Sequence, residues 1–364
     1  MTSLFFIAAL FLAAAASLVT CCPPSDRAAL LALKASLHEP FVGIFKSWTG
    51  NDCCRNWYGV TCDPNNARVT YINLRGQSED PIFHKANRTA YMSGTISPAL
   101  CQLTWLSSII IADWKGISGF IPNCISYLPN LRILDLFGNK LTGQVPRHIG
   151  HLKRLKILDL ADNELSGWLP NSISNLSSLT HLDLRNNQIS GALPRNLGNL
   201  RMMSRALLSR NQITGPIPNS LSKIYRLSEL DLSLNQISGS IPRSLGKMRV
   251  LATLNLDGNK LSGKIPSKLL HSSVSILNLS KNSLDGTIPD VFGPRSYLTS
   301  IDLSYNELKG PIPKSISDAS YVGHLDVSHN HLCGAIPAGS PFDRLDASSF
   351  SSNDCLCGKP LRAC

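Results

Sequence analysis

Aspartate recurs at one position of a repeated sequence pattern, which raises the question of carboxylate chemistry. A pair of carboxyl groups can hydrolyse a glycosidic bond when one is protonated and the other is ionised. Here the aspartates occupy the same place in successive repeats, which predicts a regular column rather than a facing pair. We therefore expect a solvated polar stripe. Its members are Asp135, Asp159, Asp183, Asp231, Asp302 and Asp326.

Two further groups of residues have the composition of a catalytic or metal site. His324, His329 and His331 lie close together in sequence and could be drawn as a zinc site. Gly258 to Lys264 resembles a phosphate loop, but Ile265 stands where Ser or Thr is needed. We interpret the first group as exposed histidines and the second as a repeat turn. The chain also lacks G-x-S-x-G, H-E-x-x-H and G-x-G-x-x-G motifs. The sequence thus predicts a binding protein that is not an enzyme and has no cofactor or metal.

The repeat itself is the strongest signal in the chain. Nine asparagines follow one another at intervals of 24 residues, with a single interval of 23. Each stands in the frame L-x-L-x-x-N-x-L-x-G-x-I-P, as in residues 134–146 and 254–266. The asparagines are Asn139, Asn163, Asn187, Asn211, Asn235, Asn259, Asn282, Asn306 and Asn330.

The frame has a physical reason at each position. Two leucines separated by one residue point the same way in an extended strand, so one strand per repeat can stack into a parallel sheet. The Asn tolerates the tight turn that follows, and its amide both donates and accepts hydrogen bonds. These properties predict a buried asparagine ladder that satisfies backbone groups. Because one repeat cannot bury its own apolar face, the predicted fold is a solenoid.

Two irregular repeats precede this run. In residues 107–122 the Gly and Pro stay in frame, but Lys115 takes the place of Asn. Residues 69–76 have the strand pattern and are followed by a polar insertion at 77–92. The prediction is therefore about eleven coils, with strands from about 70–74 to about 323–327.

The two ends of the chain differ from the repeats. Residues 4–19 carry no charge and are shorter than the ~20 residues that span a bilayer, which is typical of a signal peptide. Residues 25–37 predict an amphipathic helix, capped by Ser25 or Asp26, that covers the first open edge. The expected divisions are a signal peptide at 1–20 with an open cleavage point, an N-terminal cysteine cap at 21–68, repeats at 69–337 and a C-terminal cysteine cap at 338–364.

The eleven cysteines gather near the ends of the chain, and residues 125–332 contain none. Their spacing does not match a zinc site, so disulfides in an oxidising compartment are the better interpretation. An odd total leaves one cysteine over, and Cys21 is our candidate.

Several segments resemble a known class of protein. CCPPSDRAALLALK, DCCRNWYGVTC and HLCGAIPAGSPF, with the L-x-G-x-I-P repeats, look like a plant extracellular leucine-rich-repeat protein. More narrowly, KGISGFIP, SRALLSRNQITGPIP, GTIPDVFG and YVGHLDVSHNHLCG are similar to the DNA-damage-repair/toleration proteins, relatives of the polygalacturonase-inhibiting proteins. This resemblance implies a curved right-handed solenoid. Its parallel sheet would line the concave face, short helical return segments the convex face, and a smaller second sheet the L-x-G turns.

The resemblance also implies which cysteines form the cap disulfides. The pair Cys101 and Cys124 lies outside the caps of the inhibitors, but 23 residues is almost one coil and brings the two side by side. The expected bonds are Cys22–Cys53, Cys54–Cys62, Cys101–Cys124, Cys333–Cys355 and Cys357–Cys364.

The same resemblance implies a function in recognition outside the cell. The expected partner is a protein, for instance a pectin-degrading enzyme, and the alternative is a structural or stress-response wall component that holds acidic polysaccharide such as pectin. The family name suggests DNA, and a net charge of +11 would permit it. The chain has no recognised DNA-binding motif and no tract of several adjacent Lys or Arg, so a DNA-damage-tolerance role is implied only by the family name. We therefore expect no nucleic-acid partner, and a secreted monomer that does not span a membrane, with plastid targeting as the lesser alternative.

The repeat period places the partner contacts on the concave face, where residues flanking the strand leucines point outward. The sixth coil breaks the column, because Leu207 replaces its aspartate between Arg205 and Arg210. Ordinary drift on a solvated face would explain the break equally well. The candidate binding residues are Asp159, His181, Asp183, Arg185, Arg205, Leu207, Arg210, Glu229 and Asp231.

The return segments carry a different signal. Between residues 141 and 321 they contain fifteen basic and three acidic residues. This excess predicts a convex surface that attracts polyanions, represented by Arg243, Lys247 and Arg249, unless it serves solubility alone. Three N-glycosylation motifs begin at Asn87 in the insertion, Asn175 on a return segment and Asn278 in a strand.

Overall fold

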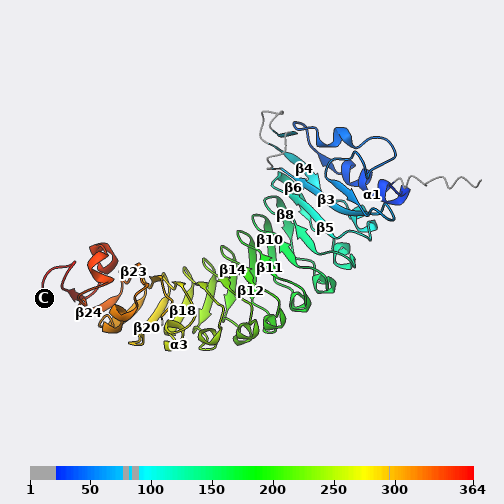
Figure 1. Ribbon diagram of the computed structural model, residues 1–364. Helices are drawn as coiled ribbons and strands as arrows, with labels where there is room; N and C mark the ends of the chain where they lie inside the picture. The colour runs from blue at the N-terminus through cyan, green and yellow to red at the C-terminus, as the bar shows by residue number, and fades with distance from the viewer. Residues whose placement is uncertain (1–21, 77–81, 84–89, 295) are drawn as a thin grey trace, which may run out of the picture.

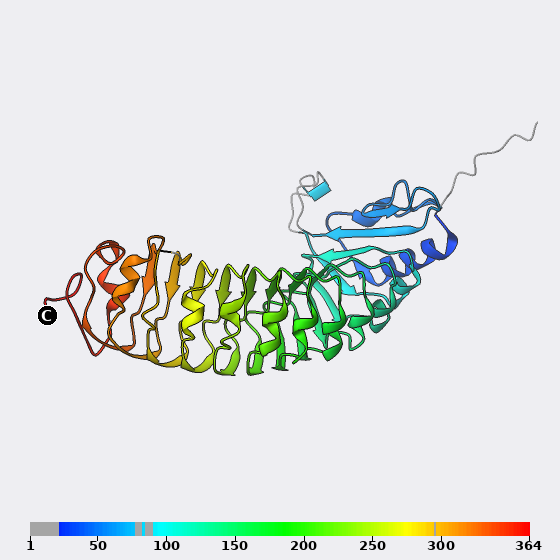
Figure 2. The same cartoon turned by 60° about the horizontal axis from the view of Figure 1, so that its bottom comes forward.

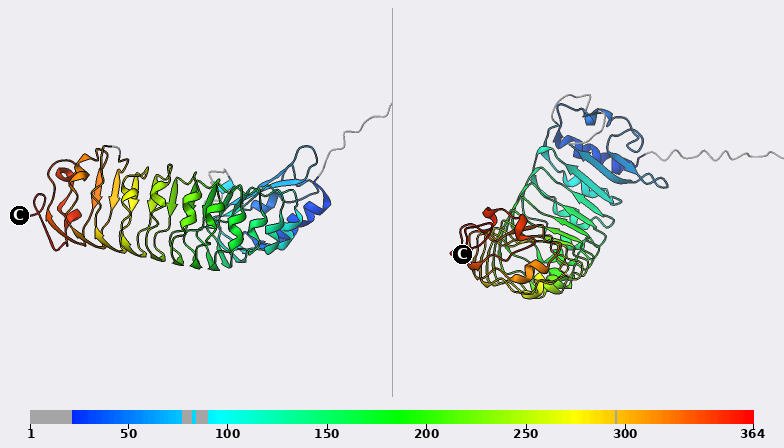
Figure 3. Two further views of the ribbon diagram at one scale, coloured as in Figure 1. Left: turned by 90° about the horizontal axis from the view of Figure 1, so that it is seen from below. Right: turned by 60° about the vertical axis from the view of Figure 1, so that its left-hand side comes forward.

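The computed structural model describes residues 22–76, 82–83, 90–294 and 296–364. The expected signal peptide, Cys21, Asn87 and Arg295 lie outside these residues. The described chain is a stack of coils that curves in an arc between two caps (Figure 1). Short helical turns follow one another along the outer side of the arc (Figure 2), and Figure 3 shows the same stack from two further sides.

The first sheet has twelve strands and is the sheet that the sequence analysis places on the concave face. Eleven of them are parallel to one another, which confirms the predicted solenoid, while β2 pairs antiparallel with β3 in the N-terminal cap. The strands are β2 (Val60–Cys62), β3 (Val69–Arg75), β5 (Ser108–Ala112), β7 (Ile133–Asp135), β9 (Ile157–Asp159), β11 (His181–Asp183), β13 (Arg205–Leu207), β15 (Glu229–Asp231), β17 (Thr253–Asn255), β19 (Ile276–Asn278), β21 (Ser300–Asp302) and β23 (His324–Asp326).

The second sheet forms at the L-x-G turns and has thirteen strands. Its first strand pairs antiparallel with the next, and its last strand belongs to the C-terminal cap. The strands are β1 (Leu37–His38), β4 (Met92–Thr95), β6 (Lys115–Phe120), β8 (Lys140–Gly143), β10 (Glu164–Trp168), β12 (Gln188–Ala192), β14 (Gln212–Gly215), β16 (Gln236–Gly239), β18 (Lys260–Lys264), β20 (Ser283–Thr287), β22 (Glu307–Gly310), β24 (His331–Ala335) and β25 (Cys355–Cys357).

Short helices return the chain from the second sheet to the first. Five of these nine helices begin directly after the proline of the turn, which is the N-cap residue and has an extended backbone. The return helices are η2 (Pro98–Gln102), η3 (Asn123–Tyr127), η4 (Ile149–His151), η5 (Asn171–Asn175), η6 (Leu197–Asn199), η7 (Asn219–Lys223), η8 (Leu245–Lys247), α3 (Ser267–Leu270) and η9 (Lys314–Asp318). The caps add α1 (Pro24–Ala35), η1 (Ile44–Ser47), η10 (Phe342–Arg344) and η11 (Ala347–Phe350).

The asparagines form the ladder that the sequence predicts. The Asn211 Nδ2 donates to the carbonyls of Leu184, Leu208 and Ser209, at 2.9, 3.2 and 3.2 Å. Its Oδ1 accepts the backbone N–H of Ile189 from the preceding coil at 3.0 Å. Each amide thus joins two coils, and the side chain is buried in seven of the nine, with Asn259 and Asn282 half-buried, so the ladder fixes the strands relative to one another.

The ladder is longer than the nine aligned asparagines, and one prediction about it is wrong. Strand register places Trp114, rather than Lys115, level with Asn139. The buried Trp114 indole donates its Nε1–H to the Leu74 carbonyl at 2.8 Å, in place of an amide, and Lys115 is exposed. At the other end, Asn353 in the C-terminal cap donates to the Val327 carbonyl at 3.1 Å and extends the ladder.

The helix of the N-terminal cap begins earlier than predicted. It starts at Pro24, with Pro23 before it, and neither Ser25 nor Asp26 caps it. The Asp26 side chain is fully buried and instead accepts hydrogen bonds from the Arg68 side chain at 3.0 Å and the Val69 backbone N–H at 3.0 Å. This buried carboxylate therefore attaches the helix to the first repeat strand.

Five disulfides join the same pairs that the sequence analysis expects: Cys22–Cys53, Cys54–Cys62, Cys101–Cys124, Cys333–Cys355 and Cys357–Cys364. Four close the two caps, and one joins the return turns of the first two complete coils. None of the described helices has the length and apolar character of a membrane span.

Candidate binding face on the concave sheet

The concave sheet places side chains in columns that run across the coils. In β11 the Leu182 side chain is buried, while His181 and Asp183 point to the opposite face. Asp135, Asp159 and Asp183 are direct neighbours in register on β7, β9 and β11. Their backbones are therefore about 4.8 Å apart from one strand to the next.

Each aspartate of this column first serves its own turn. The Asp159 Oδ1 accepts the backbone N–H of Ala161 at 3.1 Å. The Asp231 Oδ1 accepts the corresponding N–H of Ser233 at 3.0 Å and also the Ser233 hydroxyl at 2.7 Å. This is an Asx turn, which caps the end of the strand. The recurrence of aspartate thus has a structural cause and does not point to hydrolysis.

Two arginines neutralise the aspartates on either side of Asp159. Arg75 forms ion pairs with Asp113 and Asp135, and Arg185 binds Asp183 with its Nη2 2.7 Å from Oδ2. Asp183 is only 2% exposed, so Arg185 covers most of it. Asp159 lies between these two pairs, and among the described residues no cation forms an ion pair with it.

Burial shifts the pKa values of two side chains in this region. It raises the pKa of the Asp159 carboxyl to about 7, helped by the charges of Asp183 and Asp135 and opposed by the Ala161 hydrogen bond and by Arg185. Burial, followed by the charge of Arg205, lowers the pKa of His181. The face therefore holds a carboxyl that ionises near neutral pH and, on the neighbouring strand β11, an imidazole whose pKa lies below its usual value.

Near its centre, the face carries charged side chains and one exposed leucine. Arg205 and Glu229 form an ion pair across β13 and β15, with Nε 2.7 Å from Oε2. Leu207 is only 3% exposed and offers little contact surface, although it was expected as a binding residue. The exposed leucine is Leu234, which lies one coil further and shares with Arg210 a positive φ, +53° and +56° respectively.

Leu234 is a binding candidate that sequence reasoning missed. Its place after the strand is occupied by Asp162 and Asn186 in earlier coils, and these residue types tolerate a left-handed backbone better than leucine does. A leucine at this place in the repeat is the signal that could have identified it. A strained, exposed apolar side chain is a reason to look for function at this position.

Sequence reasoning also missed side-chain contacts at the C-terminal end of the face. The Tyr305 and His329 rings stack with their centroids 4.0 Å apart and an angle of 10° between their planes. The His331 Nδ1 lies 3.1 Å from the Asp354 Oδ1 of the C-terminal cap. His329 and His331 thus contact different partners. Within the described ranges, the one group with metal-ligand spacing is Cys22, Cys53 and Cys54, whose sulfurs belong to two disulfides.

The remaining predicted residues lie away from this face, except Asn278, which is in register with Asp302 in the same column. Arg243, Lys247 and Arg249 are exposed in and around η8 on the outer side. Asn175 is exposed at the end of η5, and its backbone carbonyl accepts a hydrogen bond from Lys153 Nζ at 3.0 Å. Asn278 is half-buried on β19, where its Oδ1 accepts hydrogen bonds from the backbone and hydroxyl of Ser280 at 3.0 and 2.8 Å.

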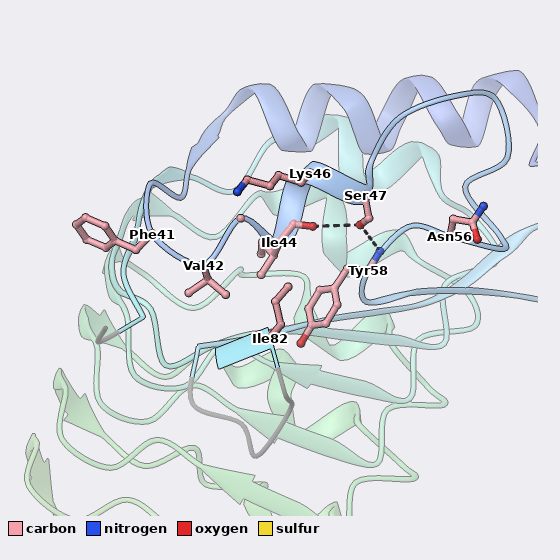
Figure 4. A pocket seen from close by; sticks show the side chains of 9 residues that line it. Phe41, Val42, Ile44, Lys46, Ser47, Asn56, Tyr58 and Ile82 are labelled. Atoms are coloured by element: carbon pink, nitrogen blue, oxygen red, sulfur yellow. Dashed lines mark hydrogen bonds between the residues drawn. The ribbon is translucent and has the colours of Figure 1, made fainter. Parts of the chain in front are cut away.

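A hollow of about 600 Å³ lies in the N-terminal cap, apart from the concave columns (Figure 4). The Ser47 hydroxyl supports its wall, since it donates to the Ile44 carbonyl at 3.2 Å and accepts the Tyr58 N–H at 2.9 Å. Ile82, from the insertion, forms another part of the lining. Because most of that insertion lies outside the described residues, the hollow does not define a ligand.

Comparisons with known proteins agree with this architecture. A family model described as a leucine-rich repeat region matches residues 108–309, and a leucine-rich-repeat N-terminal domain matches residues 23–63. The chain is 61% identical over 122 residues to the DNA damage-repair/toleration protein DRT100 of Arabidopsis thaliana, which is 33% of each chain. It is 34% identical over 115 residues to polygalacturonase inhibitor 1 of Oryza sativa subsp. japonica, which is 32% of this chain and 30% of the inhibitor. The matched segments thus span about a third of each relative.

Among solved structures, a plant ice-binding protein aligns over 94% of this chain and 98% of its own. The TM-score is 0.69 and the sequences are 29% identical. The names of these similar proteins refer to different ligands. The side chains on the concave face, rather than the fold, must therefore indicate what this chain binds.

Proposed function

Since this chain belongs to the leucine-rich-repeat family, we propose that it is an extracellular binding protein whose concave sheet recognises a protein partner. The observation that carries the proposal is the Arg205–Glu229 ion pair on β13 and β15, together with the exposed Arg210 and Leu234 on the turns that follow these two strands. This is a surface of both charge signs around an apolar contact point. Such a surface favours a partner with a complementary charge pattern, as proteins have.

The backbone beneath these residues supports the proposal. The asparagine ladder joins each coil to the next, so the columns are held in place before a partner arrives. A preorganised surface loses less conformational entropy on binding than a flexible one. Ice carries no charges that would pair with Arg205 and Glu229, so this face favours a protein over the ligand named for the structural neighbour.

Similarity to a polygalacturonase inhibitor suggests the kind of protein to test first. We expect the full chain to bind and inhibit one member of a panel of purified endopolygalacturonases. The double variant Arg205→Glu and Arg210→Glu should lose at least about tenfold in affinity, because it reverses the exposed charges at the centre of the face. Arg243→Glu on the outer side is the matched control and should leave affinity unchanged. Equal binding by the double variant would count against the concave site.

A second candidate function rests on the outer side, where basic residues outnumber acidic ones. Arg243, Lys247 and Arg249 are all exposed and follow one another around η8. A basic surface attracts polyanions without reading their sequence, and salt screens that attraction over ~8–10 Å. We propose that this side holds the chain to an acidic wall polysaccharide such as de-esterified pectin, with the plant cell wall as its location.

Retention on immobilised pectate tests the outer side independently of the concave face. Binding should weaken steeply with added salt, and it should survive the Arg205→Glu and Arg210→Glu changes. Reversal of Arg243, Lys247 and Arg249 to Glu should release the protein. If the triple variant stays bound at low salt, the basic residues serve solubility rather than attachment.

A further inference from the structure

The outer face of the second sheet carries two unusually exposed aromatic side chains. Phe120 is 73% exposed and Trp168 is 65% exposed, more than any other large apolar side chain among the described residues. Each follows the glycine of its L-x-G turn, at equivalent places two coils apart on β6 and β10. The buried side of this sheet is filled by leucine and isoleucine, so these rings have no role in the core.

The sheet presents the rings rather than covering them. A Cβ atom placed on Gly143 would come within 2.4 Å of Cδ1 of Phe120, so the ring lies directly over this glycine of the next coil. Gly143 has a φ of +77°, which suits glycine. Trp168 has a similar neighbour, because a Cβ on Gly191 would lie 3.3 Å from its own Cβ. A glycine of the next coil thus leaves room beside each ring.

Strand register sets the distance between the two rings. Phe120 lies opposite Thr142, and Thr142 lies opposite Glu164, which is four residues before Trp168 on the same strand. Two strand spacings across the sheet and four residues along it give a backbone separation of about 16 Å. Thr142, Gln144 and Ser166 point outward between the rings and supply hydroxyl and amide groups.

Charge narrows the choice of ligand. The surface between the rings carries no charge, although the whole chain has a net charge of +11. Lys140 and Glu164, of opposite sign, flank it only at the start of their strands. Two exposed rings with uncharged hydrogen-bonding groups between them are complementary to a neutral, extended sugar chain. The C–H faces of its rings pack on aromatic side chains, and its hydroxyls bind amides and hydroxyls.

We propose that Phe120 and Trp168 form a binding platform for a neutral, extended β-linked polysaccharide. The platform is separate from the concave face and from the basic outer turns, so it would hold the chain to a second kind of polymer. Aromatic side chains are also frequent in contacts between proteins. A protein ligand at this place is therefore the outcome that would overturn the proposal.

Titration of the full chain with a soluble cello-oligosaccharide tests the platform. Calorimetry should detect binding that is insensitive to salt, and tryptophan fluorescence should change as Trp168 is covered. Trp168→Ala and Phe120→Ala should each weaken binding about tenfold, while Trp168→Phe should restore most of the affinity because it keeps a ring. Tyr127→Ala, an equally exposed aromatic on a return turn, is the matched control.

Gly143→Ala gives a second, independent test, because its Cβ would displace the Phe120 ring without removing it. We expect the same direction of change as for Phe120→Ala. No binding of the oligosaccharide by the wild-type chain, or equal binding by the folded Phe120 and Trp168 variants, would overturn the proposal. So would a protein partner that is lost on Trp168→Ala while the oligosaccharide is still bound. None of these outcomes affects the Arg205 and Arg210 experiment on the concave face.

Discussion

Asp159 and Asp302 hold equivalent positions in the concave sheet, but their surroundings differ. The Asp302 Oδ1 accepts the backbone N–H of Ser304 at 3.0 Å and its hydroxyl at 2.7 Å. Asp159 is followed two residues later by Ala161, which offers a backbone N–H alone. Burial raises the pKa of Asp159 to about 7. The two carboxyls therefore differ in their hydrogen-bond partners, because Asp302 has a serine hydroxyl that Asp159 lacks.

This difference separates the aspartates that serve only the structure from the one that is available for binding. Every aspartate of the column caps its turn, and at Asp231 and Asp302 a serine hydroxyl adds a second hydrogen bond. The N-terminal coils instead use Arg75 and Arg185 on the outer carboxylates and leave Asp159 without a cation. The N-terminal region thus keeps a carboxyl whose charge changes near neutral pH, and a partner or a proton can bind there.

The largest predicted effect tests whether the two regions differ in anchoring as well as in charge. The Cys101–Cys124 bond lies next to the N-terminal coils, and the middle coils have no counterpart. Replacing both cysteines with Ser should lower the free energy of unfolding by about 2–4 kcal/mol, chiefly because the unfolded chain gains freedom. Urea unfolding measures it, and non-reducing peptide mapping checks the bond. Free thiols at both positions in the secreted protein would contradict the pairing.

The next prediction concerns the ladder, which should be the same in both regions. Asn211→Ala removes the donor to three carbonyls and the acceptor for one N–H, and Asn306→Ala does the same further along. Each should destabilise the chain by about 1–3 kcal/mol, because buried backbone groups lose their partners. Thermal unfolding measures both variants. An unchanged melting temperature for either would show that the amides are not structural.

The ladder also shows how much of the fold the sequence could predict. A period of 24 residues with leucines at fixed offsets determines the strands and the buried amides, because both follow from local spacing. Local spacing gave the wrong residue at one position. There the indole N–H of Trp114 binds the Leu74 carbonyl that an amide would otherwise bind. Lys115 stays in frame with the later repeats and looks like the equivalent residue until strand register is known.

The candidate site was less predictable, for a related reason. Spacing assigns a residue to the concave face but does not say how far its neighbours cover it. Leu207 was predicted to contact a partner but is buried, whereas Leu234 was not predicted and is exposed. The pKa of Asp159 depends on its burial by neighbouring coils and on the charges of Asp135, Asp183 and Arg185, which belong to those coils. Those are contacts between coils, and the period of one repeat does not contain them.

The third prediction tests the pKa of Asp159 through its effect on stability. An unfolded Asp has a pKa near ~3.9, so between about pH 4 and 7 the folded chain binds more protons than the unfolded chain and its stability falls as pH rises. Asp159→Asn should remove this loss. We expect it to stabilise the chain by about 2 kcal/mol at pH ~8, roughly half of the full linkage value because the carboxyl is partly exposed, and to change little at pH ~4. Denaturation at both pH values measures the effect.

Asp302→Asn is the control for that prediction in the other region. Its carboxylate binds a serine hydroxyl, which an amide oxygen accepts less strongly, so this variant should lose a little stability near neutral pH. Equal responses of the Asp159 and Asp302 variants to pH would remove the difference between the two regions.

The smallest predicted effect comes from exchanging the residue two places after the aspartate between the two regions. Ala161→Ser gives Asp159 the hydroxyl that Ser304 gives Asp302, and the buried Ser304 shows that the same place in the coil has room for it. The new hydrogen bond favours the ionised carboxylate, so the pKa of Asp159 should fall and the chain should gain about 1 kcal/mol at pH ~8. Ser304→Ala should cost a similar amount in the C-terminal coils. Carboxyl titration by NMR follows the pKa, and urea unfolding follows the stability. If Ala161→Ser leaves the pKa of Asp159 unchanged, the surrounding carboxylates and desolvation set its acidity, and the missing hydroxyl does not.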